Sequence, residues 1–290
     1  MSGNEHKQTR SEQRNAARDK ARQLREEHAR KERSKKVWVR ALIAIVVVGI
    51  IGGVTIGVVA GVQQQNAVNS AGNPANMTFD DGIKLGANLE AFTSSHTPVP
   101  TPAPTSTTAV PNIKIYLDFQ CPICQMFEQG NGQQLRSWVK SGAATLEIHP
   151  ISFLDRSSPN KYSSRAANAA ICVANYSPDN FFDFYSLLYQ HQPAEGTNGP
   201  ENAELIQRTQ EVGVKAASSI ADCINNTAYS KWLGEATNKA LTASTLPGTT
   251  NTPLKGTPTV LVNNQQYTFA TTDELTNPAR FAAFVQQVSK

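Results

Sequence analysis

The sequence has 290 residues, a hydrophobic fraction of 39%, a charged fraction of 17% and a formal net charge of +4. Both fractions are below the averages of globular proteins, which indicates uncharged linker and argues against one uniform soluble domain. The net positive charge comes entirely from residues 1–40, where 13 basic and 6 acidic side chains give a net charge of +7. The rest of the chain has a net charge of −3. This mixed charge, without a known nucleic-acid-binding pattern, argues against nucleic acid as a partner.

Residues 41–62 contain no charged side chain and are rich in Ile, Val and Ala. As a helix they would be about 33 Å long, enough to cross the hydrocarbon core of a membrane. The positive-inside rule places the basic tail 1–40 in the cytoplasm and the chain after residue 62 outside. A cleavable signal peptide is the alternative, but both the basic and the apolar region are too long for its usual pattern. We therefore expect an uncleaved, single-pass membrane anchor.

Residues 63–111 are polar and rich in proline, with prolines alternating at 98, 100, 102 and 104. Alternating prolines favour an extended chain and exclude a helix, so this stretch is predicted to be a linker. Only residues 81–86 within it have the character of an isolated strand or hairpin. The folded domain is expected at residues 112–290, a size that suits a single domain.

The domain begins with a strand–helix–strand pattern. Residues 113–119 are β-branched and aromatic and predict a strand, Pro122 opens a helix to about Lys140, and residues 144–153 predict a second strand. A helical insertion of four or five short pieces follows, at about residues 163–255. Strand character returns at residues 259–262, with a partner strand around 267–269 and a final helix from Asn277-Pro278. The order is therefore βαβ, a block of helices, and ββα.

The sequence Cys121-Pro122-Ile123-Cys124 joins the first strand to the N-terminus of a helix. The helix dipole and the free backbone N–H groups favour a thiolate there. The first cysteine gains most, so we expect Cys121 to be the attacking nucleophile and Cys124 the resolving thiol. Exchange would pass through a mixed disulfide with a cysteine of the substrate.

Three other chemistries compete for these cysteines. A four-cysteine zinc site usually needs two CxxC pairs, whereas Cys172 and Cys223 are lone residues. A purely structural disulfide across two residues would do little to restrict the unfolded chain. A cysteine hydrolase would need His149 or His191 as a base, and each is more simply a structural histidine. Redox chemistry is therefore the prediction for the CxxC pair.

The strand–CxxC–helix unit, the helical insertion and the segment from Gly256 to Val260 resemble DsbA-like thiol–disulfide oxidoreductases of the thioredoxin fold. The run from Asp118 to Cys124 is similar to that of membrane-anchored members. The resemblance covers about residues 112–290 and implies an α/β, thioredoxin-like fold (βαβ…ββα) with a helical insertion, here preceded by the transmembrane helix. It also implies that Pro258 is cis and that Thr257 faces the cysteine pair, with its backbone free to pair with a substrate strand.

Two positions depart from the family pattern. Relatives often have a buried acid six residues before the nucleophile, where this chain has Ile115, and strand alternation leaves the facing of Asp118 open. The strongest oxidants have a histidine directly before the second cysteine, where this chain has Ile123. With Ile123 in place of that histidine, we expect a less strained and less oxidising disulfide. Pro122 and Ile123 are expected to tune the cysteine pair or to contact the substrate.

The remaining two cysteines, Cys172 and Cys223, both fall in the helical insertion. An exported compartment permits a disulfide between them, and the resemblance to membrane-anchored relatives implies one. Closing a loop of that length would stabilise the insertion by up to about 4 kcal/mol. Two buried free thiols are the alternative.

These features predict an exported, membrane-tethered enzyme that forms or reshuffles disulfides in other exported proteins, without a metal or a cofactor. The resemblance implies cysteine-containing client proteins and a membrane-embedded reoxidant of the DsbB or VKOR type. The alternatives are an isomerase or reductase, and a non-catalytic thioredoxin-like binding or chaperone module. A reduction potential above about −200 mV would indicate an oxidase, and one near −270 mV a reductase.

Overall fold

The computed structural model describes residues 72–98 and 110–290. The predicted tail 1–40 and anchor 41–62 lie outside these residues, as do parts of the predicted linker 63–111. Within the described ranges, no helix combines the length and the apolar composition that crossing a membrane requires. The described fold is thus that of the domain that carries the cysteines.

A five-stranded sheet forms the centre of this domain, in the order β1-β3-β2-β4-β5. The central strands β2 (Asn112–Leu117) and β3 (Thr145–Pro150) are parallel and are joined by the helix α2 (Pro122–Lys140). The other pairs are antiparallel: β4 (Thr259–Val262) with β2, β5 (Gln265–Gln266) with β4, and β1 (Ile83–Leu85) with β3. Because β2 and β3 are buried on both faces, neither shows a clean alternation of polar and apolar residues.

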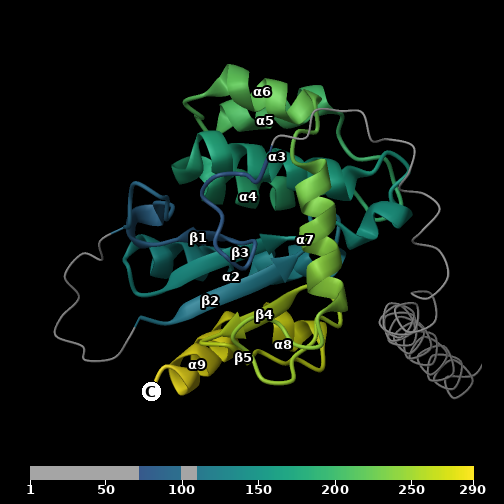
Figure 1. The fold of residues 1–290 in the computed structure, drawn as a ribbon. Helices are drawn as coiled ribbons and strands as arrows, with labels where there is room; N and C mark the ends of the chain where they lie inside the picture. Colours follow the sequence, from purple (N-terminus) through teal and green to yellow (C-terminus); the bar gives the residue numbers. More distant parts are fainter. Residues whose placement is uncertain (1–71, 99–109) are drawn as a thin grey trace, which may run out of the picture. The chain divides into compact units, whose positions relative to one another are not determined.

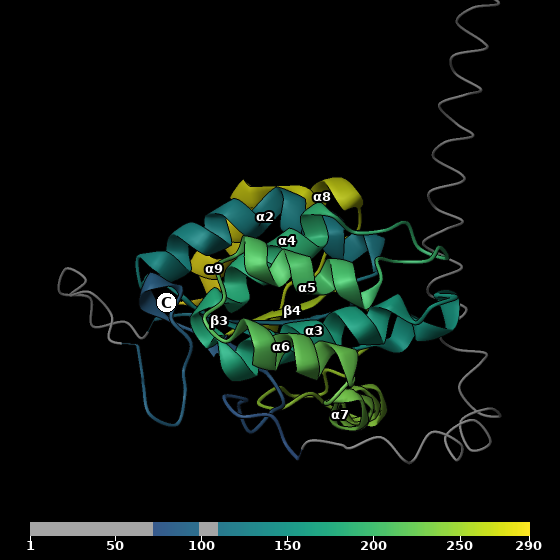
Figure 2. The ribbon, with the colours of Figure 1, turned by 90° about the horizontal axis from the view of Figure 1, so that it is seen from above.

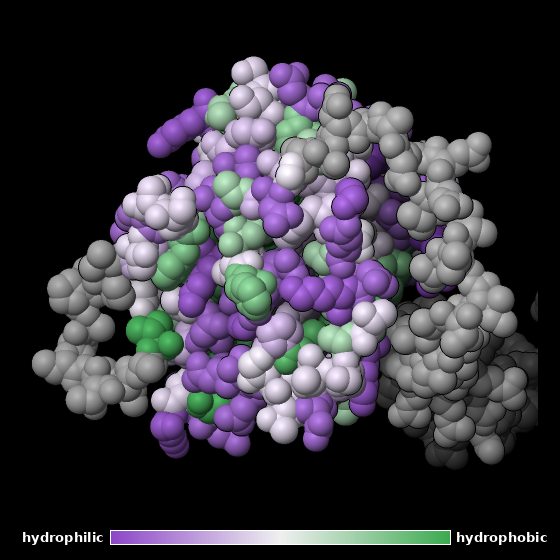
Figure 3. Space-filling model, viewed as in Figure 1, coloured by the Kyte–Doolittle hydropathy of each residue, from purple (hydrophilic) through white to green (hydrophobic). Residues whose placement is uncertain are grey.

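Helices cover both faces of the sheet (Figures 1 and 2). On one face, α2 packs against α8 (Thr272–Thr276) and α9 (Pro278–Val288). On the other face lies α7 (Ser230–Thr242), where Tyr116 and Leu261 from the sheet join Ala240 in a small separate core. The side of the molecule seen in Figure 3 is mostly hydrophilic, with small separate hydrophobic patches. The apolar residues of the domain thus serve mainly the two cores.

The ends of α2 follow from its sequence. Pro122 occupies the first turn, where its missing N–H costs no hydrogen bond. After Lys140, Gly142 adopts a left-handed conformation with φ 74°, which ends the helix. Asn277 caps α9 by accepting hydrogen bonds from the backbone N–H groups of Ala279 and Arg280. The predictions of α2 and of the last helix are confirmed.

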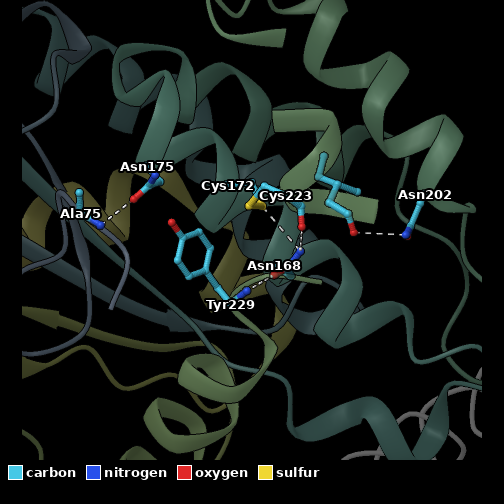
Figure 4. The surroundings of a disulfide bond; sticks show 8 residues. Ala75, Asn168, Cys172, Asn175, Asn202, Cys223 and Tyr229 are labelled. Carbon is cyan, nitrogen blue, oxygen red and sulfur yellow. Dashed lines mark hydrogen bonds between the residues drawn. A yellow bond between two sulfur atoms is a disulfide. The ribbon is translucent and has the colours of Figure 1, made fainter. Parts of the chain in front are cut away.

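The insertion between β3 and β4 consists of α3 (Tyr162–Tyr176), α4 (Phe181–Gln190), α5 (Asn202–Glu211), α6 (Ala217–Asn225) and α7, with short 3-10 turns at Phe153–Ser157 and Pro178–Asn180. A disulfide joins Cys172 on α3 to Cys223 on α6, with a Cα–Cα distance of 5.9 Å. Figure 4 shows Asn168 beside it, with its amide donating to the Cys223 carbonyl at 3.5 Å and accepting from the Tyr229 N–H at 2.9 Å. The bridge and this asparagine tie three parts of the insertion together.

The predicted start of the domain near Asn112 needs correction. Residues 83–85, inside the stretch predicted as linker, form the edge strand β1, and the side chains of Ile83 and Leu85 are fully buried. This N-terminal segment is held by polar contacts as well: the Thr78 hydroxyl donates to Glu147 at 2.6 Å. Its strand pairing joins residues more than 60 positions apart, which a local pattern cannot reveal. The partner of β4 is likewise shifted, to residues 265–266 instead of 267–269.

Candidate functional site

The two cysteines of the CxxC sequence lie where β2 passes into α2. Cys121 is the N-cap residue of α2, Pro122 is the first helical residue, and Cys124 follows one turn into the helix. Both carry free thiols, and both are buried, with exposed fractions of 5% for Cys121 and 2% for Cys124. The side chain of Ile123 is partly buried against the main core. The strand–helix junction therefore holds the two sulfurs on one helical turn at the edge of the core.

The two thiols are electrostatically different. A hydrogen bond from Cys124 lowers the pKa of Cys121, with smaller help from the Thr257 hydroxyl, and together these outweigh the effect of burial. Burial raises the pKa of Cys124 well above its usual value, and its hydrogen bond to Cys121 raises it further. A low pKa makes Cys121 the more available thiolate and the better leaving group. The difference between the two pKa values is in the direction that a nucleophilic Cys121 and a resolving Cys124 require.

The loop before β4 brings a second part of the chain to the cysteines. The Thr257–Pro258 peptide bond is cis, and the thiol of Cys121 donates to the carbonyl of Thr257 at 3.4 Å. The Thr257 hydroxyl is buried and has no hydrogen-bond partner among the described residues, which leaves it free to turn toward a thiolate. The structure thus gathers Cys121, Cys124, Thr257 and Pro258 in one place.

Asp118, whose facing the sequence left open, is fully buried just before the CxxC turn. One carboxylate oxygen accepts from the Gln120 N–H at 2.9 Å, and the other accepts from the Leu154 N–H at 3.0 Å and the Ser163 hydroxyl at 2.5 Å. Burial raises the pKa of Asp118 to about 6 in spite of these hydrogen bonds. Because the Cys121 N–H donates to the backbone carbonyl of Asp118 at 3.0 Å, this residue fixes the turn to the insertion.

Two side chains from α4 and the residues after it also hold the turn, and sequence reasoning missed both. The amide of Gln192 donates to the carbonyls of Phe119 and Cys121 at 2.9 and 3.1 Å. The Tyr189 hydroxyl donates to the Asp118 carbonyl at 3.1 Å. These contacts span about 70 residues of chain, and no motif or spacing marks them in the sequence.

Other candidate residues lie elsewhere. The Cys172–Cys223 disulfide belongs to the insertion, and His149 contacts Glu147 and Tyr116 on the sheet. In the part of the chain that the structure describes, no group of three or more His, Cys, Asp and Glu side chains is arranged to hold a metal ion. The chemistry available at the site is that of the two thiols.

Comparison with known proteins agrees with this geometry. The family model described as Thioredoxin matches residues 105–286, and no curated protein matches the chain in sequence. The structure of oxidised DsbA from Mycobacterium tuberculosis is 30% identical, with a TM-score of 0.53, and the match covers 72% of this chain and 93% of that one. The reduced disulfide bond oxidoreductase DsbG from the same organism is 29% identical, with a TM-score of 0.55 and coverages of 72% and 87%.

A more distant structure, oxidised BdbD from Bacillus subtilis, shares the fold at 14% identity, with a TM-score of 0.52 and coverages of 76% and 97%. The residues matched by the family model include the CxxC turn, the insertion and the cis-proline loop. The chain therefore belongs to the thioredoxin family, as a DsbA-like protein thiol:disulfide oxidoreductase.

Proposed function

We propose that this enzyme forms or reshuffles disulfides in exported proteins, with Cys121 as the nucleophile and Cys124 as the resolving thiol. The observation that carries the proposal is the placement of Cys121 at the N-cap of α2, within 3.4 Å of the Thr257 carbonyl in the cis-proline loop. Such a loop leaves backbone groups free to pair with an extended substrate segment. A client cysteine would then lie beside the sulfur that it must exchange with.

The exchange follows from the two thiol pKa values. A client thiolate attacks the Cys121 sulfur of the Cys121–Cys124 disulfide, and Cys124 leaves as a thiolate that burial causes to take up a proton. A second client thiolate then attacks the client sulfur of the mixed disulfide, and Cys121 leaves as the stabilised thiolate. The client loses two electrons and gains a disulfide, and the enzyme is left with two reduced cysteines. When the client already holds a wrong disulfide, the Cys121 thiolate starts the reshuffling by attacking one sulfur of that disulfide.

The proposal includes export and a membrane anchor at residues 41–62. Its support is the uncharged 41–62 segment next to a tail with net charge +7, since the positive-inside rule then places the enzyme domain outside the cytoplasm. The Cys172–Cys223 disulfide is also of a kind that persists in oxidising compartments. A membrane-embedded reoxidant of the DsbB or VKOR type would restore the active disulfide. Labelling of single cysteines placed at residues 5 and 200 from outside intact cells tests this topology: only the second should react.

A trapping experiment tests the assignment of roles. Cys124→Ala leaves Cys121 without a resolving partner, so mixed disulfides with exported proteins should accumulate and should disappear on reduction. Cys121→Ala is the matched control and should trap none. Mixed disulfides that form through Cys124 and not through Cys121 would reverse the roles, and their absence in both variants would favour a binding module.

Alkylation gives an independent measure of the same roles. At neutral pH, iodoacetamide should modify Cys121 of the reduced enzyme first and Cys124 much more slowly, because only the thiolate reacts. Mass spectrometry of peptides after timed quenching provides the two rates. Equal rates, or a faster Cys124, would contradict the order of attack proposed here.

A further inference from the structure

A small cavity lies on the face of the sheet that α7 covers, apart from the cysteine site. Its volume is about 180 Å³, and its walls come from the N-terminal segment, β2, the end of β3, α7 and the loop after α7. Figure 1 shows α7 crossing this face beside the N-terminal segment. On the α7 side the wall is formed by Ala236, Lys239 and Ala240 of the helix and by Ala243 directly after it. The small alanine side chains leave space where larger ones would pack on the sheet.

The opposite wall carries two buried polar side chains that lack partners. Tyr116 and His149 are each 2% exposed and are stacked with their ring centroids 4.2 Å apart. Neither the Tyr116 hydroxyl nor the His149 Nδ1 atom has a hydrogen-bond partner in residues 72–98 or 110–290. Buried polar groups are nearly always satisfied, so two that line one cavity indicate a missing partner.

The surroundings of His149 decide whether its Nδ1 atom donates or accepts a hydrogen bond. Its Nε2 atom lies 3.3 Å from a carboxylate oxygen of Glu147, outside good hydrogen-bond geometry but facing an acceptor. A side chain added at Gly82 would approach Nε2 to 2.7 Å, so the chain closes that edge of the ring. With a proton on Nε2, toward Glu147, Nδ1 is left as a hydrogen-bond acceptor without a partner. A ligand must therefore supply a hydrogen-bond donor.

The charges around the cavity favour a cation. Asp80 and Asp81 line it, and Glu147 lies behind His149. The two nearby ammonium groups are engaged with these acids: Lys114 with Asp80 at 3.0 Å and Lys239 with Asp81 at 2.7 Å. Three carboxylates against two ammonium groups leave one excess negative charge.

We propose that this cavity binds a small planar organic cation with N–H donors, of the amidinium or guanidinium class. The flat body of such a ligand would lie along Ala236 and Ala240 of α7 and reach the edges of the stacked Tyr116 and His149 rings. Its N–H groups meet the Nδ1 lone pair, the Tyr116 oxygen and the carboxylates at the rim. The site is separate from the thiol chemistry, so its occupancy does not depend on the roles of the cysteines.

Calorimetric titration of the full-length chain with three probes of one shape tests this site. Benzamidine is the planar cation, benzamide its neutral analogue and benzoate its anionic analogue. Benzamidine should bind at one site per chain, benzamide more weakly, and benzoate should give no binding heat. Tyr116→Phe removes one unpaired buried hydroxyl, so the fold should tolerate it, but benzamidine binding should weaken about tenfold.

Ala240→Leu provides a second, steric variant and should abolish binding by filling the cavity from α7. Tyr176→Phe is the matched control, because Tyr176 is 40% exposed and does not line the cavity, and its affinity should equal that of the wild type. The proposal is overturned if benzamidine produces no saturable heat at millimolar concentration. It is also overturned if benzoate binds as well as benzamidine, or if neither Tyr116→Phe nor Ala240→Leu weakens binding.

Discussion

Replacing Asp118 by Asn should change how the stability of the domain depends on pH. The carboxyl group is fully buried, and burial raises its pKa from 3.8 to about 6. The folded chain therefore binds more protons at this residue than the unfolded chain between about pH 4 and pH 6. The stability that protonation contributes is fully present below about pH 4 and is lost as the pH rises through about 6.

The size of the effect follows from the difference of about two pKa units, which corresponds to about 3 kcal/mol. Because no part of the carboxylate is exposed, solvent screening does not reduce this figure. The amide introduced by Asp118→Asn does not titrate, but its NH₂ group would face a backbone N–H donor, either that of Gln120 or that of Leu154. That mismatch costs about 1–3 kcal/mol at every pH. The change of stability with pH, and not the constant offset, is therefore the diagnostic quantity.

Urea unfolding of the full-length chain, at several pH values from 4 to 8, measures both variants. The free energy of unfolding of the wild type minus that of Asp118→Asn should fall by about 3 kcal/mol across this range. Asp222→Asn, which removes an exposed carboxylate on α6, is the control for the loss of one negative charge. A difference that stays constant with pH, or that rises, would refute the account of Asp118.

Two further predictions concern packing and the second disulfide. Replacing both Cys172 and Cys223 by Ala should lower the free energy of unfolding by about 4 kcal/mol, because the bridge closes a loop over a sequence separation of 51. Denaturant unfolding measures this loss of stability. A loss below about 1 kcal/mol would argue against the bridge. Gly130→Ala should destabilise the fold by about 1–3 kcal/mol, since an added Cβ on α2 would collide with the backbone of α8. Gly234→Ala on α7 meets nothing within 4 Å and, in the same unfolding assay, should be neutral or stabilising by up to about 1 kcal/mol. Equal losses for the two glycine variants would contradict the close approach of α2 and α8.

Local signals in the sequence accounted for the elements that hold the cysteines. Pro122 and the Ser141-Gly142 pair mark the ends of α2, and Asn277-Pro278 marks the start of α9, because caps and breakers act on their immediate neighbours. The Thr-Pro pair before a strand could be placed beside the cysteines only through the family resemblance. The membrane anchor and the topology remain predictions, since residues 41–62 lie outside the described ranges.

The features that could not be predicted depend on contacts between distant parts of the chain. The strand character of residues 81–86 was visible in the sequence, but the pairing of the three-residue strand β1 with β3, which makes it part of the domain, depends on residues more than 60 positions away. The inward facing of Asp118 could not be read from alternation, because the strand β2 directly before it is buried on both faces. Gln192 and Tyr189 reach the CxxC turn from the insertion, and their roles depend on how α4 packs.

Transfer of the active disulfide to a reduced peptide shows whether Cys121 and Cys124 carry the thiol–disulfide exchange. The oxidised full-length enzyme is mixed with a synthetic peptide that carries two cysteines, and both are quenched with acid, alkylated and weighed by mass spectrometry. The peptide should gain one disulfide for each enzyme chain, and the new thiols should map to Cys121 and Cys124 while Cys172 and Cys223 stay joined. Cys121→Ser should abolish the transfer. Transfer that persists in this variant, or new thiols at Cys172 and Cys223, would contradict the assignment of the site.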